Sequence, residues 1–217
     1  MELKGTAINF LGDSITEGAG TSGIGKRFTD ILSSEYEIIS FNYGIGGTRI
    51  ARQQNPSTEP VWDRDFISRV DEMEESSDVV VVFGGTNDYG HGDAPIGNFN
   101  DRTPDTFYGA LHTLYTKLIE KFYGKPIIIL TPLHRLNEES KRGENKSEDV
   151  ASLKEYVEII REVAEYYSLP VLDLFKESGL QPAIPVIKEN YMPDGLHPND
   201  AGHKVLAQKI ANYLKTL

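Results

Sequence analysis

The chain has 217 residues, of which 39% are hydrophobic and 25% are charged, and its formal net charge at pH 7 is −11. It contains no cysteine, which excludes disulfides, thiolate nucleophiles and zinc–thiolate sites. The excess of acidic groups disfavours binding to nucleic acid or anionic lipid, and no segment approaches the roughly 18 consecutive apolar residues of a membrane span.

Five short apolar runs are expected to form β-strands. They cover residues 6–11, 36–43, 78–83, 125–131 and 169–175. Continuous apolar runs of this length are typical of parallel strands that are covered on both faces. Amphipathic stretches, which predict helices, lie between and after these runs at residues 26–34, 61–75, 105–122, 148–167 and 200–216.

The alternation of strands and helices predicts an α/β fold, a three-layer α/β/α sandwich with a doubly wound sheet of about five parallel strands. The length fits one domain over residues 1–217. Two connections are long, at residues 84–104 and 132–149, and long loops at strand ends are usually functional or mobile. The second is polar and charged enough to be mobile.

Chemically useful residues follow several of the predicted strands. Gly12-Asp13-Ser14 follows the first strand, residues 42–49 follow the second, residues 84–88 follow the third, and Asp194 and His197 lie beyond the fifth. A turn or a helix cap would explain each group taken alone. Because the carboxyl ends of parallel strands meet at one edge of the sheet, however, we expect these groups to converge.

The converging residues contain the parts of a serine hydrolase. A serine hydroxyl becomes a good nucleophile when an imidazole removes its proton, so Ser14 is the predicted nucleophile and His197 the predicted base. Asp194 is placed to fix the tautomer of His197. The backbone N–H groups of Ser14 and Gly47 and the side-chain amide of Asn87 are the predicted donors to the oxyanion.

No cofactor or metal is expected. A metal-dependent hydrolase with Asp13, Asp194 and His197 as ligands is an alternative, because carboxylates and imidazoles bind metals. It is disfavoured because no HxH or HExxH pattern accompanies these residues. Trp62, His134 and Arg135 follow the second and fourth strands and could line a cleft, but they are left outside the predicted site.

Four segments of the chain resemble the sequence blocks of the GDSL-like, or SGNH, hydrolases. They are FLGDSITEG, NYGIGGTR, GGTND and DGLHPNDAGH, and they occur in the family's order between Phe10 and His203. The first reads GDSI where the family's name has GDSL, which keeps the apolar character of that position. The nucleophile motif also differs from the GxSxG elbow of α/β-hydrolases.

The resemblance implies a flavodoxin-like fold, a catalytic triad of Ser14, Asp194 and His197, and an oxyanion hole formed by Ser14, Gly47 and Asn87. Gly47 is preferred to its neighbouring glycine because the family's glycine usually follows five residues after the asparagine of the second block. His112 and His203 fall within predicted helices and are assigned no catalytic role.

The expected function is therefore that of a serine esterase that forms an acyl-enzyme and acts on small acyl esters, such as acetates, of a carbohydrate or another small alcohol. One alternative is a lysophospholipase or thioesterase that acts on lipids. Another is a non-catalytic α/β module that binds a small ligand at its glycine-rich strand ends. The expected partner is a small-molecule ester, with no nucleic acid and no stable membrane association. The start of the chain has no recognisable leader, which predicts a cytoplasmic location.

Overall fold

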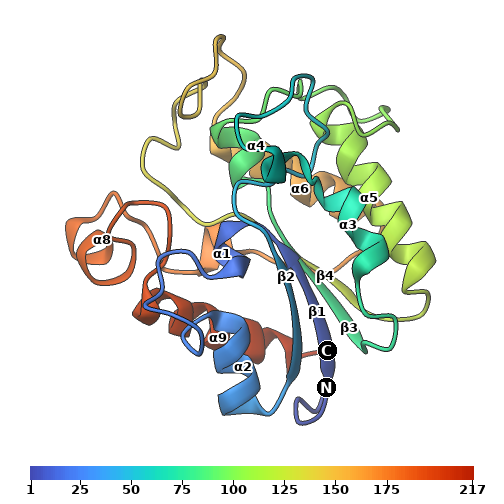
Figure 1. The fold of residues 1–217 in the computed structure, drawn as a ribbon, viewed down its shortest axis with the longest axis vertical. Coiled ribbons are helices and arrows are strands. Elements are labelled where there is room, and N and C mark those ends of the chain that lie inside the picture. Colours follow the sequence, from blue (N-terminus) through green and yellow to red (C-terminus); the bar gives the residue numbers. More distant parts are fainter.

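The computed structural model describes residues 1–217 and contains one sheet of five parallel strands (Figure 1). The strands are β1 (Ala7–Gly12), β2 (Ile39–Gly44), β3 (Val79–Phe83), β4 (Ile127–Leu130) and β5 (Val171–Leu172). Their order in the sheet is β2-β1-β3-β4-β5, and all four pairings are parallel. The predicted α/β sandwich with a parallel sheet is thus confirmed.

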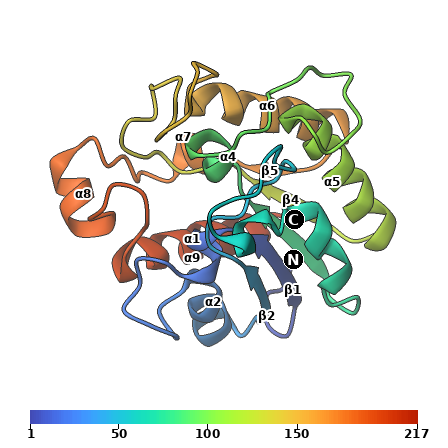
Figure 2. The same ribbon diagram turned by 45° about the horizontal axis from the view of Figure 1, so that its top comes forward.

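Helices cover both faces of this sheet. The α-helices are α1 (Ser14–Glu17), α2 (Phe28–Tyr36), α3 (Phe66–Arg69), α4 (Thr86–Gly90), α5 (Phe107–Lys121), α6 (Leu153–Tyr166), α7 (Leu174–Glu177), α8 (Pro185–Tyr191) and α9 (Asp200–Leu214), and the 3-10 helices are η1 (Pro60–Asp63) and η2 (Val70–Glu72). Figures 1 and 2 show α2 and α9 on one face, and α3, α5 and α6 on the other. None of the helices combines the length and the apolar character needed to span a bilayer.

The apolar residues of β3 explain the two layers of helices. Val80 and Val82 point into a core that they share with α3, α5 and α6, while Val79, Val81 and Phe83 point into a second core shared with α1, α2 and α9. Successive side chains of a strand alternate between its two faces, so a run of five apolar residues supplies both cores. This is why the central strands read as continuous apolar segments.

The carboxyl ends of the three strands that matter for function lie level with one another. Gly12 at the end of β1 is paired with Gly44 of β2 and with Phe83 of β3. The segments that follow these strands therefore leave the sheet side by side. This edge carries α1, the glycine-rich segment after β2, and α4.

Several boundaries differ from the prediction, and capping residues account for most of the differences. The predicted helix at 61–75 is divided into η1, α3 and η2, because Asp65 caps a new helix by accepting a hydrogen bond from the Ser68 N–H at 2.7 Å. The fifth strand has only two residues, because Asp173 caps α7. The short helix α8 was not predicted; it begins with Pro185 at its first position.

The segment at 132–149, expected to be mobile, is attached to α4 by hydrogen bonds. The Glu144 N–H donates to the Gly90 carbonyl at 2.8 Å, the Lys146 ammonium donates to the Asp88 carbonyl at 2.7 Å, and the Tyr89 hydroxyl donates to the Asn137 carbonyl. The segment is therefore a cover over α4 rather than a free loop.

Candidate active site

Ser14 stands at a sharp turn from strand to helix. It is the first residue of α1, directly after β1 and Asp13, and Asp13 caps the helix by accepting a hydrogen bond from the Ile15 N–H at 3.0 Å. The turn needs glycine at position 12, because a Cβ atom there would lie 2.0 Å from the Thr16 hydroxyl oxygen. The serine hydroxyl is thereby presented beyond the edge of the sheet.

A chain of hydrogen bonds joins Ser14 to the turn before α9. The Ser14 Oγ lies 2.9 Å from His197 Nε2, and His197 Nδ1 lies 2.7 Å from Asp194 Oδ2. This is the geometry in which a base can take the serine proton while a carboxylate fixes its tautomer. The three side chains predicted from sequence are therefore brought together.

Asp194 is itself held by the backbone. Its Oδ1 accepts hydrogen bonds from the N–H groups of Leu196 at 2.8 Å and His197 at 2.7 Å. Burial acts to raise the pKa of Asp194, but the hydrogen bonds from the His197 ring and from these two N–H groups outweigh it, and the pKa lies below its usual value. Asp194 thus remains a carboxylate at neutral pH, fixed in orientation toward the imidazole.

The glycine-rich segment after β2 passes beside Ser14. A Cβ atom on Gly46 would lie 3.6 Å from the Ser14 Cβ. The Gly46 N–H already donates to the Glu17 carboxylate at 2.9 Å, whereas the Gly47 N–H has no acceptor within the protein. Gly47 has φ of +74°, in a turn that is closed by a hydrogen bond from the Thr48 N–H to the Ile45 carbonyl. Of the two glycines, Gly47 is the one with a free donor.

Asn87 lies in α4 and is oriented by the same glycine-rich segment. Its Nδ2 donates one hydrogen bond to the Thr48 carbonyl at 3.0 Å, and the side chain is buried. An amide nitrogen has two hydrogens, so the second stays available for a ligand. The first hydrogen bond also fixes which end of the amide carries the donors.

The carboxylates of Asp13 and Asp88 are buried nearby but are not part of the Ser14–His197–Asp194 hydrogen-bond chain. Burial raises the pKa of Asp13 to about 6 and also raises the pKa of Asp88. The Asp88 carboxylate accepts hydrogen bonds from the backbone N–H groups of Ile50 at 3.0 Å and Ala51 at 2.9 Å. It holds the chain that follows the glycine-rich segment, which is a structural role. No group of three or more His, Asp or Glu side chains is arranged to hold a metal ion.

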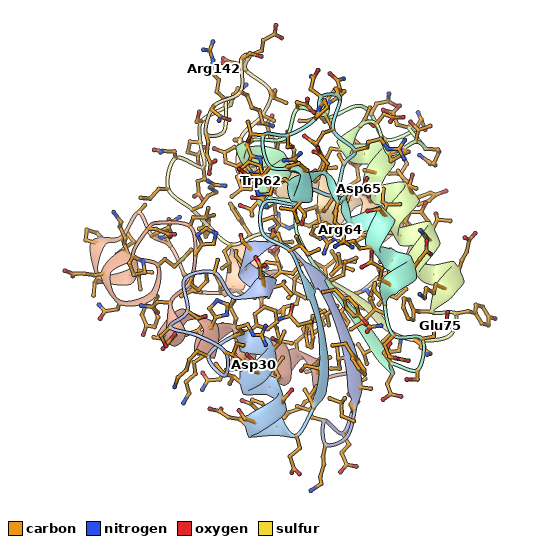
Figure 3. The ribbon with its side chains drawn as sticks, in the orientation of Figure 1. Asp30, Trp62, Arg64, Asp65, Glu75 and Arg142 are labelled. Atoms are coloured by element: carbon orange, nitrogen blue, oxygen red, sulfur yellow. The ribbon has the colours of Figure 1, made fainter.

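The three residues left outside the predicted site have different positions. Trp62 belongs to η1 (Figure 3). Its side chain lies against Gly47, and its ring centroid is 5.1 Å from that of His91. Arg135 is buried and donates to the Thr86 carbonyl at 3.2 Å and to Glu144. His134 Nδ1 instead lies 2.9 Å from the Glu138 carboxylate.

A cavity of about 280 Å³ lies beside the turn that carries Asp194 and Leu196. The segment with Arg135 and Glu144 forms its other wall, and three of its nine lining residues are hydrophobic. Asp194 lines the cavity, as does Tyr89 of α4, so the cavity lies next to the Asp194 end of the hydrogen-bond chain. Its lining suits a polar group rather than an alkyl chain.

Sequence reasoning missed two residues that shape the site, Glu17 and Arg69. The Glu17 carboxylate accepts the hydrogen bond from the Gly46 N–H. The position of Glu17, three residues after Ser14, could have indicated this, because one helical turn brings it to the same side of the helix as Ser14. Arg69 donates hydrogen bonds to Gly12, Tyr43 and Thr48. It lies in α3, outside the four sequence blocks that resemble the family, and nothing in its local sequence indicates these contacts.

Comparisons with known proteins give solved structures with a similar fold and one matching family. Solved structures with a similar fold include a protein from Lactobacillus plantarum (30% identity, TM-score 0.83, covering 99% of this chain and 98% of that one) and a Bacteroides ovatus protein assigned to the GDSL-like lipases (19%, 0.68, 100% and 100%). A third is a two-domain esterase active on acetylated mannans (20%, 0.64, 98% and 50%). A comparison with curated sequences finds no match. The model of the GDSL-like lipase/acylhydrolase family matches residues 10–205, and the chain belongs to this family.

Proposed function

We propose that this protein is a serine esterase that hydrolyses short acyl esters, such as acetates, of a carbohydrate or another small polar alcohol. The observation that carries the proposal is the continuous hydrogen-bond chain from Ser14 Oγ through His197 to Asp194, with distances of 2.9 and 2.7 Å. Family membership supports a hydrolase, and the hydrogen-bond chain supports acyl transfer through Ser14.

In the proposed mechanism, Ser14 Oγ attacks the ester carbonyl as its proton passes to His197 Nε2. Asp194 stabilises the imidazolium that forms. The oxyanion accepts hydrogen bonds from the Ser14 N–H, the Gly47 N–H and the free hydrogen of the Asn87 amide. His197 then gives its proton to the leaving alcohol, and an acyl-enzyme remains. Water activated by the same histidine releases the acid and restores the serine.

The surroundings of the site favour a short acyl group and a polar alcohol. Trp62 lies against Gly47, which limits the space next to the proposed position of the carbonyl. The cavity beside Asp194 has three hydrophobic residues among nine, and a larger one of about 550 Å³ near His91 has two among twelve. A long acyl chain needs an apolar groove to offset the loss of its hydration, so lipid hydrolysis is the less favoured activity.

Hydrolysis of 4-nitrophenyl acetate by the wild type and by Ser14→Ala tests the proposal. The wild type should hydrolyse the ester and the variant should lose the activity. Ser22→Ala serves as a control, because the Ser22 hydroxyl donates an exposed hydrogen bond to Asp200 at 2.7 Å and takes no part in the site. Intact-mass spectrometry after treatment with an organophosphonate should show one adduct in the wild type and none in Ser14→Ala. An unmodified wild type, under conditions that label a control serine esterase, would contradict the mechanism.

A series of 4-nitrophenyl esters from acetyl to dodecanoyl, together with acetylated monosaccharides, tests the substrate class. We expect kcat/KM to fall as the acyl chain lengthens and acetate release from the sugars to depend on Ser14. A preference for dodecanoyl esters would favour the lipid acylhydrolase instead. Binding of ligands without turnover of any ester would favour the non-catalytic module.

A further inference from the structure

Arg69, at the end of α3, is the largest fully buried side chain of the protein. Its guanidinium donates hydrogen bonds to the carbonyls of Gly12 at 3.2 Å, Arg64 at 3.1 Å and Tyr43, and to the Thr48 hydroxyl at 3.0 Å. The phenyl ring of Phe66 lies 4.8 Å from the guanidinium carbon. All four acceptors are uncharged, so the cation is buried without a directly bonded carboxylate.

The burial of an arginine in this way contributes little to the stability of the fold. Burial lowers the pKa of Arg69 to about 10, opposed mainly by the charge of Asp13, so the side chain still carries its charge at neutral pH. A buried charge costs free energy, and a well-packed apolar side chain in its place is often at least as stable. What the guanidinium offers, and an apolar side chain does not, is several donors in a fixed planar geometry.

The acceptors of Arg69 adjoin the three proposed oxyanion donors. Gly12 lies two residues before Ser14, at the end of β1. Thr48 directly follows Gly47, and its carbonyl accepts the hydrogen bond that orients Asn87. One planar cation therefore connects the turn that carries the nucleophile with the segment that carries Gly47 and fixes Asn87.

Thr48 is the point where these connections meet. Its hydroxyl accepts from Arg69 and donates to the Ile45 carbonyl at 2.7 Å, its N–H donates to the same carbonyl, and its own carbonyl accepts from Asn87. A displacement of Thr48 would move the Gly47 N–H and release the Asn87 amide together. Oxyanion stabilisation depends on donors that are fixed before charge develops, so such a displacement lowers the reaction rate more than substrate binding.

We propose that Arg69 is a positioning residue of the oxyanion hole, which acts through the Gly12 carbonyl and the Thr48 hydroxyl to hold the Ser14, Gly47 and Asn87 donors in one geometry. This inference rests on the proposed esterase function but adds a residue outside the family's sequence blocks. Arg69 does not touch the substrate. Its effect is confined to the preorganisation of groups that do.

Thr48→Val and Thr48→Ser form the decisive pair of variants, because valine keeps the shape of threonine without its hydroxyl and serine keeps the hydroxyl. With 4-nitrophenyl acetate, we expect Thr48→Val to lower kcat about tenfold or more, with KM changed much less, and Thr48→Ser to stay close to the wild type. The pH at which kcat/KM is half-maximal should not move, because the Ser14–His197–Asp194 chain is untouched.

Ser77→Ala is the matched control. Ser77 is buried and accepts a hydrogen bond from the Asn9 amide at 2.8 Å, at the opposite end of the sheet. This variant also loses one buried hydrogen bond, so it should lower the thermal midpoint while kcat stays at the wild-type value. Equal kcat in Thr48→Val and Ser77→Ala would overturn the proposal, because both would then act only on stability.

Arg69→Met and a double variant with Thr48→Val test the coupling. If Arg69 acts partly through Thr48, the loss of kcat in the double variant should be smaller than the product of the two single losses. Independent, multiplicative losses would contradict the inference. Should Arg69→Met fail to fold, Arg69→Lys provides the cycle, since an ammonium group lacks the planar set of donors with which the guanidinium reaches Gly12, Tyr43, Arg64 and Thr48 together.

The side-chain amide signals of Asn87 give a readout that needs no substrate. In ¹⁵N-labelled protein, these signals are assigned by their loss in Asn87→Ala. We expect them to shift and to exchange faster with solvent in Thr48→Val, and to remain as in the wild type in Thr48→Ser. If the Asn87 signals become mobile in Thr48→Val but the wild type hydrolyses no ester, the positioning role stands and the esterase is refuted. Unchanged signals in an active Thr48→Val variant would refute the positioning role alone.

Discussion

The indole ring of Trp62 occupies the place where a side chain on Gly47 would be. A Cβ atom on Gly47 would lie 2.2 Å from both Cδ1 and Nε1 of the indole. The backbone of Gly47 also has φ of +74°, which L-residues with a side chain rarely adopt. Two independent constraints therefore require glycine beside the proposed oxyanion.

Gly47→Ala should lower kcat about a hundredfold or more, because the new methyl group displaces the N–H donor as it moves away from the indole. Gly5→Ala is a matched control, since Gly5 has φ of +77° and nothing within 4 Å of its added Cβ. It should show the strain of the left-handed backbone as a lower thermal midpoint, with kcat unchanged. A double variant with Trp62→Ala should recover part of the activity. Wild-type kcat in folded Gly47→Ala would exclude Gly47 as a donor.

Asn87→Ala should lower kcat roughly a hundredfold with a much smaller change in KM, because the amide acts on charge that develops after binding. Activity should fall without vanishing, since the Ser14 and Gly47 N–H groups remain. Asn87→Asp should be at least as inactive, because a carboxylate offers no donor and repels the oxyanion. If Asn87 only formed a turn, the thermal midpoint of Asn87→Ala would fall, and the kcat of the folded fraction would stay at the wild-type value.

Asp194→Asn should lower kcat by about three to four orders of magnitude, as expected when the orienting carboxylate of a triad is replaced by an amide that favours the wrong imidazole tautomer. The amide oxygen can still accept from the Leu196 and His197 N–H groups, so the fold should be retained. Asp200→Asn is the control, because Asp200 bonds only Ser22 near the start of α9. Similar kcat values in the two variants would argue against a triad.

Asp13→Asn should stabilise the protein at neutral pH relative to the wild type. Burial raises the folded-state pKa of Asp13 to about 6, above the 3.8 of an ordinary aspartate side chain, so folding favours the protonated form. The stabilisation of the fold by the protonated Asp13 side chain is fully present below about pH 4 and is lost as the pH rises through about 6. The amide keeps the acceptor for the Ile15 N–H but does not ionise.

Urea unfolding at pH 4 and pH 7.5 measures this effect. The free energy of unfolding of Asp13→Asn minus that of the wild type should increase by about 2 to 3 kcal/mol between the two pH values, since each pKa unit corresponds to about 1.4 kcal/mol. Asp65→Asn, at the N-cap of α3, removes a carboxylate whose hydrogen bond to Ser68 is exposed, and should show a smaller change. A difference that does not vary with pH would mean that Asp13 carries no buried charge.

The central strands and the residues at their carboxyl ends were predictable because their signals are local. β3 reads VVVVF, and a short run of β-branched and aromatic residues between turn formers is typical of a strand covered on both faces. In the structure, the register of the parallel strands sets Gly12 level with Gly44 and Phe83. The convergence of the groups after these strands followed from this topology.

The features that could not be predicted depend on contacts between segments that are distant in sequence. Arg69 reads as an ordinary charged residue in an amphipathic helix, and only the position of α3 against the strand ends sends its side chain inward. Trp62 faces Gly47 because η1 folds back over the glycine-rich segment. The fifth strand ends early because Asp173 caps a helix, where the apolar pattern alone would extend the strand.

The hydrogen bond between Ser14 and His197 joins residues 183 positions apart. Under the proposed mechanism, a chain that is being synthesised therefore cannot hydrolyse an ester until residue 197 has left the ribosome and His197 has come within reach of Ser14, although β1 and its serine are made first. Refolding from denaturant should show the same order, with the fluorescence of Trp62 and the recovery of esterase activity reporting different steps. Recovered activity would then mark the completion of folding in this molecule.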